Sequence, residues 1–157
     1  MFASPRVTVA SGATLCGNGD GFLIPSGTVL ECAGRLVGRI VVGPGGVIDT
    51  IAAMPTADAQ VVFAPGGILR IGACANGKTV PLHVASVVGP SSGGPVIDLT
   101  AAGKAPTGTV LSWDEGDAPD VTGWSALGGN RTTVFSVDAE RKCVNVKTQT
   151  GCAIIFR

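Results

Sequence analysis

One motif occurs three times in this chain of 157 residues and constrains its fold more than any other feature. A Val-Val pair is followed by a proline, a Gly-Gly pair and two aliphatic residues, at 41–48, 61–69 and 87–97. The valine pairs begin 20 and then 26 residues apart. Periods of this size are typical of architectures built from stacked repeats. The motif therefore predicts a strand, a sharp turn and a second strand in each repeat.

Glycine at the same place in each repeat indicates a corner, because glycine adopts positive φ at low cost. A single repeat cannot bury enough apolar surface alone, whereas parallel stacking lets each repeat cover the next and pair its backbone groups. The residues predicted to define the corners and their leading strands are Gly45, Gly46, Gly66, Gly67, Gly93, Gly94, Val41, Val61 and Val87. The predicted inward aliphatic stripe comprises Val41, Val42, Val47, Ile48, Val61, Val62, Ile68, Leu69, Val87, Val88, Val96 and Ile97.

Helix-breaking residues argue for an all-β protein, since 24 glycines and 10 prolines interrupt the chain every few residues. The segments between them are rich in Val, Ile and Thr, which favour strands. Residues 131–150 contain one glycine-free and proline-free window, which we expect to form two strands joined near 138–141. The predicted fold is a short right-handed parallel β-solenoid over 1–103 with a C-terminal β-hairpin cap over 104–157 in the same domain. The alternative is a β-sandwich or jelly roll.

Composition excludes several function classes. Eleven basic and eleven acidic residues balance, so the chain lacks the basic surface expected of a nucleic-acid-binding protein. No apolar run approaches the roughly 20 residues that span a bilayer. The first residues lack the pattern of a signal peptide, which leaves two readings: a protein that stays where it is made, or a segment of a longer secreted chain. The five cysteines form no C-x-x-C pair, and most are expected to be buried, unpaired thiols.

His83 is the only histidine. A Ser-His-Asp or Cys-His mechanism would have to use it, but no G-x-S-x-G nucleophile elbow is present. One histidine with scattered cysteines also gives no zinc-ligand spacing. We therefore expect His83 to lie half-exposed on a surface strand, and the sequence predicts no catalytic residue and no enzyme activity.

The segment from 112 to 120 is the most acidic in the chain. Its carboxylates are weak calcium candidates, since oxygen-rich clusters bind that ion, but they match neither an EF-hand loop nor a glycine-aspartate nonapeptide repeat. A solvated turn is favoured, and no other cofactor is predicted. These four candidates are Asp114, Glu115, Asp117 and Asp120.

Trp113 and Trp124 flank the acidic segment. Exposed aromatic rings beside carboxylates could stack on sugars, which makes the pair a candidate carbohydrate platform. Their large apolar area favours instead a plug over the end of the core. If Val144 and Val146 point inward, Cys143 points outward. Cys152 then lies on the other side of the sheet, so a disulfide between the two cysteines would need a bulge.

The order of strand-like segments in the C-terminal third, at 107–113, 118–124, 135–138 and 144–146, resembles the ends of β-strand-repeat regions in large secreted bacterial proteins of the autotransporter-passenger or adhesin type. The resemblance covers roughly residues 26–157, although such proteins are usually longer and poorer in cysteine. It implies a non-enzymatic structural role at the cell surface or outside the cell, as a segment or building block of a filament, surface layer or adhesin that self-associates by β-edge stacking. The alternatives are a phage virion component, such as a capsid decoration or fibre protein, and a carbohydrate-binding module.

Overall fold

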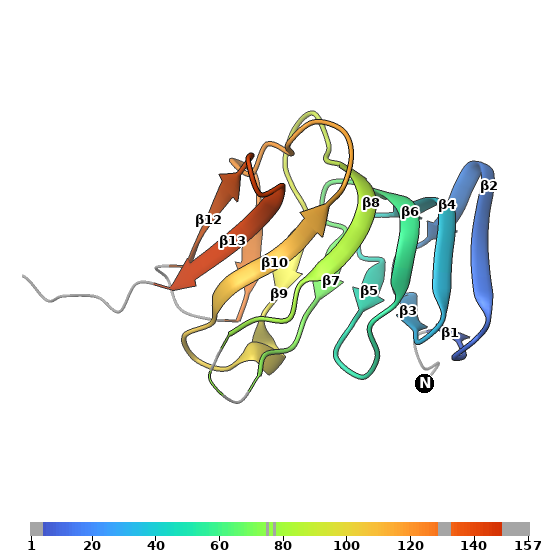
Figure 1. Cartoon of the computed structure of the whole chain (residues 1–157), viewed down its shortest axis with the longest axis horizontal. Coiled ribbons are helices and arrows are strands. Elements are labelled where there is room, and N and C mark those ends of the chain that lie inside the picture. Colours follow the sequence, from blue (N-terminus) through green and yellow to red (C-terminus); the bar gives the residue numbers. More distant parts are fainter. Residues whose placement is uncertain (1–4, 75, 77, 129–132, 149–157) are drawn as a thin grey trace, which may run out of the picture.

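The computed structural model describes residues 5–74, 76, 78–128 and 133–148. Its strands form two sheets (Figure 1). Sheet 1 has the spatial order β1 (Arg6–Val9), β3 (Val29–Cys32), β5 (Val47–Asp49), β7 (Ile68–Arg70), β9 (Val96–Asp98) and β11 (Ser125–Leu127). Sheet 2 has the order β12 (Thr133–Asp138), β13 (Cys143–Thr148), β10 (Thr107–Trp113), β8 (Leu82–Val88), β6 (Thr56–Phe63), β4 (Arg35–Val42) and β2 (Thr14–Ile24). One short 3-10 helix, η1 (Thr100–Ala102), follows β9. The all-β prediction is confirmed.

The chain alternates between the two sheets from β1 to β11, so each strand lies beside the strand two places further along the sequence. All of these neighbours are parallel. Only β12 and β13 are antiparallel, and they extend sheet 2 beyond β10. This pairing differs from that of an antiparallel jelly roll. Parallel pairing also continues through β10 and β11, past the boundary at 103 that separated the predicted cap from the repeats.

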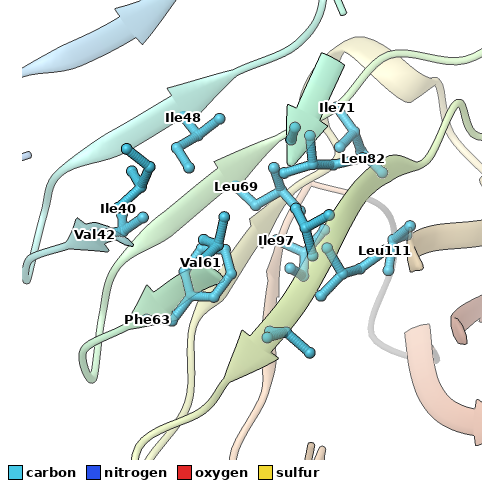
Figure 2. Close-up of a cluster of buried hydrophobic side chains, with 14 of the residues drawn as sticks. Ile40, Val42, Ile48, Val61, Phe63, Leu69, Ile71, Leu82, Ile97 and Leu111 are labelled. Carbon is cyan, nitrogen blue, oxygen red and sulfur yellow. The ribbon is translucent and has the colours of Figure 1, made fainter. Parts of the chain in front are cut away.

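Aliphatic side chains from the two sheets meet in one core (Figure 2). Of the predicted inward stripe, Val42, Val47, Ile48, Val61, Leu69, Val87 and Ile97 are buried. The prediction of burial is wrong for the other five residues, because adjacent residues of a strand point to opposite faces. These five are Val41, Val62, Ile68 and Val96, which are half-buried, and Val88, which is exposed. Val47 is buried, but it lies outside the core cluster that contains its neighbour Ile48.

The first three connections from sheet 2 to sheet 1 are four residues long, at 25–28, 43–46 and 64–67, and we call them the glycine corners. In the second, Gly46 N–H donates to the Gly43 carbonyl at 2.9 Å. Gly45, the residue before, has φ of 72°. Proline followed by a glycine of positive φ is the signature of a type II turn. The corners also bond to each other, since Gly27 donates to Gly45 and Gly45 to the carbonyl of Gly66.

The strand register corrects the predicted length of the repeat. Val41 pairs with Val62 and Val47 with Ile68, so the second repeat follows the first after 21 residues. The predicted spacing of 20 residues aligned Val41 with Val61, one position before its true partner Val62. A fourth copy, missed in the sequence, occupies 23–31, where Leu23 pairs with Val41 and Val29 with Val47.

The connections from sheet 1 to sheet 2, which we call the variable corners, differ in length from two residues at 33–34 to eleven at 71–81. Side chains at the strand ends hold them. Arg70 Nη1 contacts Asp49 Oδ2 at 3.0 Å, and Arg70 Nε contacts Asp98 Oδ2 at 2.8 Å. Burial would raise the pKa of Asp98, but hydrogen bonds from Thr100 and Arg70 outweigh it and hold that pKa below its usual value. The hydrogen bond to Asp98 raises the pKa of Arg70.

Candidate functional site

The structure brings His83 together with two residues that the sequence analysis did not connect to it. His83 lies on β8 and pairs with Ser112 of the neighbouring parallel strand β10. Its Nδ1 is 2.9 Å from Ser112 Oγ, and its Nε2 is 3.1 Å from Asp114 Oδ2. Ser112 and Asp114 are two positions apart, so they project to the same side of β10 and reach the ring from one direction.

This histidine cluster has the residue types of a hydrolytic triad but lacks the surroundings that such a triad needs. The side chains of His83 and Asp114 are 56% and 66% exposed, so water screens the carboxylate that would have to stabilise an imidazolium. The neighbouring backbone donors are also occupied, because the N–H groups of Asp114 and Glu115 both bond to the Ala85 carbonyl. We conclude that the cluster orients the start of the acidic segment.

Further hydrogen bonds hold the start of the acidic segment in place. The backbone N–H of Trp113 donates to the Lys142 carbonyl at 3.0 Å, and Lys142 Nζ donates to the Asp114 carbonyl. The segment between β10 and β11 is thereby tied to β8 on one side and to the β12–β13 turn on the other. That turn lies at 139–142, as the sequence predicted for the region around 138–141.

The acidic segment forms one wall of an open groove of about 520 Å³ over the outer face of β6 and β8. Gln60, Ser86 and Val88 line the groove from β6 and β8, and Pro119 lines it from the acidic segment itself. Glu115, Asp117 and Asp120 line the rim, whereas Asp114 is turned to His83. Hydrogen bonds from the hydroxyl and backbone N–H of Thr122 lower the pKa of Asp120.

The four predicted calcium candidates therefore do not converge. Asp114 bonds to His83, and Asp120 accepts from Thr122 N–H at 2.9 Å. Within the described part of the chain, no three His, Cys, Asp or Glu side chains are placed to hold a metal ion. Asp114 and Asp120 instead take part in local hydrogen bonds.

Both tryptophans lie in the core. Trp113 is 3% and Trp124 is 8% exposed, and the Trp124 ring packs on Phe135 at a centroid distance of 5.9 Å and a tilt of 58°. Neither offers a ring face to solvent, so the predicted sugar platform is absent. The favoured interpretation, a plug over the end of the core, fits this burial.

The four cysteines within the described residues divide evenly between buried and exposed positions. Cys32 and Cys143 are buried, whereas Cys16 and Cys74 are exposed, and all four are free thiols. Burial raises the pKa of the Cys32 thiol, although a hydrogen bond with the Gly34 backbone opposes the shift. Cys143 is buried, so the prediction that it is exposed is wrong, although its Sγ contacts Asn145 on the side of β13 that the sequence predicted. Cys152, its proposed disulfide partner, lies outside the described residues.

Comparison with known proteins returned no similarity: no family model, curated protein or solved structure matches this chain. In the portion of the chain that the structure describes, no helix has the length and apolar character needed to span a membrane. The assignment of function must therefore depend on the geometry of the two sheets and their edges.

Proposed function

We propose that this chain is a non-enzymatic structural protein, a short β-solenoid that serves as a building block and self-associates through the strand edges at its N-terminal end. In this proposal each pair of strands, one from each sheet, is one winding. The observation that carries it is the position of β1 and β2, which end their sheets without a further strand beside them among the described residues. Unpaired edges of this kind bind other chains readily.

The side chains at this end support the same proposal. Val7, Leu15 and Phe22 pack on the core but remain partly exposed, whereas Leu30 and Leu36 of the next winding are 0% exposed. Another strand pair placed against β1 and β2 would cover these side chains and remove apolar surface from water.

The opposite end differs. There the β12–β13 hairpin adds two antiparallel strands to sheet 2, and both tryptophans fill the core close to it. β11 and β12 also end their sheets among the described residues, so the choice of the N-terminal end rests on the partly exposed core side chains Val7, Leu15 and Phe22. A location at the cell surface or outside the cell belongs to the same proposal, because it follows from the resemblance to secreted β-strand-repeat proteins.

Sedimentation velocity over a wide range of protein concentration tests the proposal. We expect the weight-average mass to rise with concentration while the circular-dichroism spectrum stays that of a folded β-protein. A folded chain that remains monomeric at every concentration would overturn the proposal.

A further inference from the structure

Residues at the glycine corners show which corners leave room for a side chain beside the preceding winding. A Cβ on Gly46 would lie 2.2 Å from the carbonyl oxygen of Ile24, in the winding before. A Cβ on Gly67 would lie 2.7 Å from the Val42 carbonyl oxygen. Real Cβ atoms do not approach backbone this closely, so glycine is required at the last position of these two four-residue corners, each of which follows a parallel winding. The seven-residue connection at 89–95 has Pro95 at the equivalent position.

The first glycine corner departs from this rule. The position that corresponds to Gly46 is Thr28, since Thr28 N–H closes the turn on Pro25 as Gly46 N–H closes its turn on Gly43. Thr28 carries the Cβ that the other corners exclude. A parallel strand added beyond β2 and turning the same corner would bring its last carbonyl oxygen onto that atom. Thr28 thus blocks continuation of the stack in the parallel sense.

Among the described residues, no strand pairs with the outer edge of β2. Ile24 and Ala13 direct their carbonyls to the β4 side, where they accept from Gly43 and Arg35. Backbone groups alternate in direction along a strand, so Thr14, Cys16 and Leu23 point theirs away from β4. A bulge between Gly17 and Phe22 divides this edge into two short segments, which limits how long a ladder it can form.

We propose that the partner at this edge is a second copy of the chain, paired antiparallel through β2 about a two-fold axis. The inference rests on the proposed function and names its partner. Each outward residue offers one donor and one acceptor, so the edge is complementary to itself when reversed. The antiparallel β2 strand of the second copy does not turn the corner beside Thr28, so the Cβ of Thr28 does not obstruct it. A two-fold contact is closed, so the product is a dimer with the partly exposed side chains of both copies covered, and growth into a fibre stops there.

A matched pair of lysine substitutions tests which edge is used. Leu23 on β2 and Val134 on β12 lie on the first and last strands of sheet 2 and are 57% and 52% exposed. We expect Leu23→Lys to weaken the dimer at least about tenfold in Kd, because lysine on an edge strand opposes pairing. Val134→Lys should leave Kd unchanged. Circular dichroism checks that both variants fold.

The outcomes separate the two proposals. A wild-type chain that never associates overturns the proposed function and the dimer together. Association that Leu23→Lys does not weaken, or that both substitutions weaken equally, leaves self-association standing and overturns pairing through β2. Fibres of the wild-type chain in electron micrographs contradict the block at Thr28.

Labels introduced as non-canonical amino acids test the orientation. Thr8 on β1 is exposed at the N-terminal end, and Glu140 is exposed in the turn between β12 and β13. In the two-fold dimer, Thr8 labels lie close to each other and Glu140 labels lie far apart. A short distance between a Thr8 label on one copy and a Glu140 label on the other would show head-to-tail stacking and overturn the proposal.

Discussion

The two kinds of corner in this molecule solve the same problem by different means. A glycine corner is held by backbone hydrogen bonds, both within its four residues and to the next corner, as from Gly45 to Gly66. A variable corner adds side-chain contacts to backbone bonds such as that from Thr50 N–H to the Arg70 carbonyl. Asp49 accepts from the N–H of Ile51 at 3.0 Å, and Asp98 accepts from Thr100 Oγ1 at 2.6 Å, with Arg70 between the two carboxylates.

Length varies at both sides, since the connections from sheet 2 to sheet 1 are four residues long up to 64–67 but seven at 89–95 and eleven at 114–124. The backbone ladder nevertheless continues from Gly66 to the Gly94 carbonyl in the first of these longer connections. A side-chain ladder anchors only the strand end, and the loop beyond it can change. The rigid corner also determines which side chains of the preceding strand face the core. Val42 and Phe63 each lie three residues before the positive-φ glycine, and both are buried.

The largest expected effect tests which residues of β6 face the core. Val61 is 0% exposed, and its neighbour Val62 points outward and is half-buried. Val61→Asp should cost about 4 kcal/mol or more and unfold the protein, because it buries an unpaired charge. Val62→Asp should cost about 1 kcal/mol. Urea denaturation followed by circular dichroism measures both, and equal losses would contradict the assigned faces.

The next effect tests the crowding at a glycine corner. Gly46→Ala should destabilise the fold by about 3 kcal/mol, since the added methyl meets the Ile24 carbonyl. Gly72, in a variable corner, is the control, because its nearest neighbour atoms are 4.0 Å from the position of a Cβ. Gly72→Ala should change the free energy of unfolding by less than about 1 kcal/mol. A comparable loss at both sites would remove the distinction between the corners.

A smaller effect tests the side-chain ladder of the variable corners. Arg70→Leu leaves Asp98, whose side chain is 4% exposed, without its cation. Because Arg70 is itself 32% exposed, solvent screens part of the interaction, and we expect a loss of about 2 kcal/mol near pH 7.

The acid dependence of stability follows from the same ladder. The lowered pKa of Asp98 contributes stability that is present above the pKa of the unfolded chain and is lost as pH falls through the folded value. Without Arg70 the folded pKa rises, so Arg70→Leu should begin to lose stability at a higher pH than the wild type. Thermal melts between neutral and acidic pH measure this, and parallel pH profiles would argue against the ladder.

The smallest effect concerns the turn residues. The second glycine corner has Pro44 before its positive-φ glycine, whereas the first has Ser26. Proline restricts the unfolded chain, so Pro44→Ala should lower the free energy of unfolding by about 0.5 kcal/mol and Ser26→Pro should raise it by about the same amount. Chemical denaturation resolves the pair, and changes of the same sign would show that the corners are not equivalent.

Local patterns in the sequence predicted the strands and turns well but not the partners across the sheets. The fourth repeat at 23–31 escaped notice because its corner lacks the second glycine and places Thr28 there. The histidine cluster escaped notice for another reason. The spacing of Ser112 and Asp114 puts them on one face, but their approach to His83 depends on the register between β8 and β10.

The amino-acid sequence alone determined that this chain forms short strands joined by proline-glycine turns, because those preferences arise from the sterics of individual residues. Only the tertiary structure decided that Val61 faces the core and Val62 does not, that both tryptophans are buried, and that Thr28 occupies the position of Gly46 at the first glycine corner. Each of these depends on the hydrogen-bond register between distant strands, and a shift of one residue reverses every side chain.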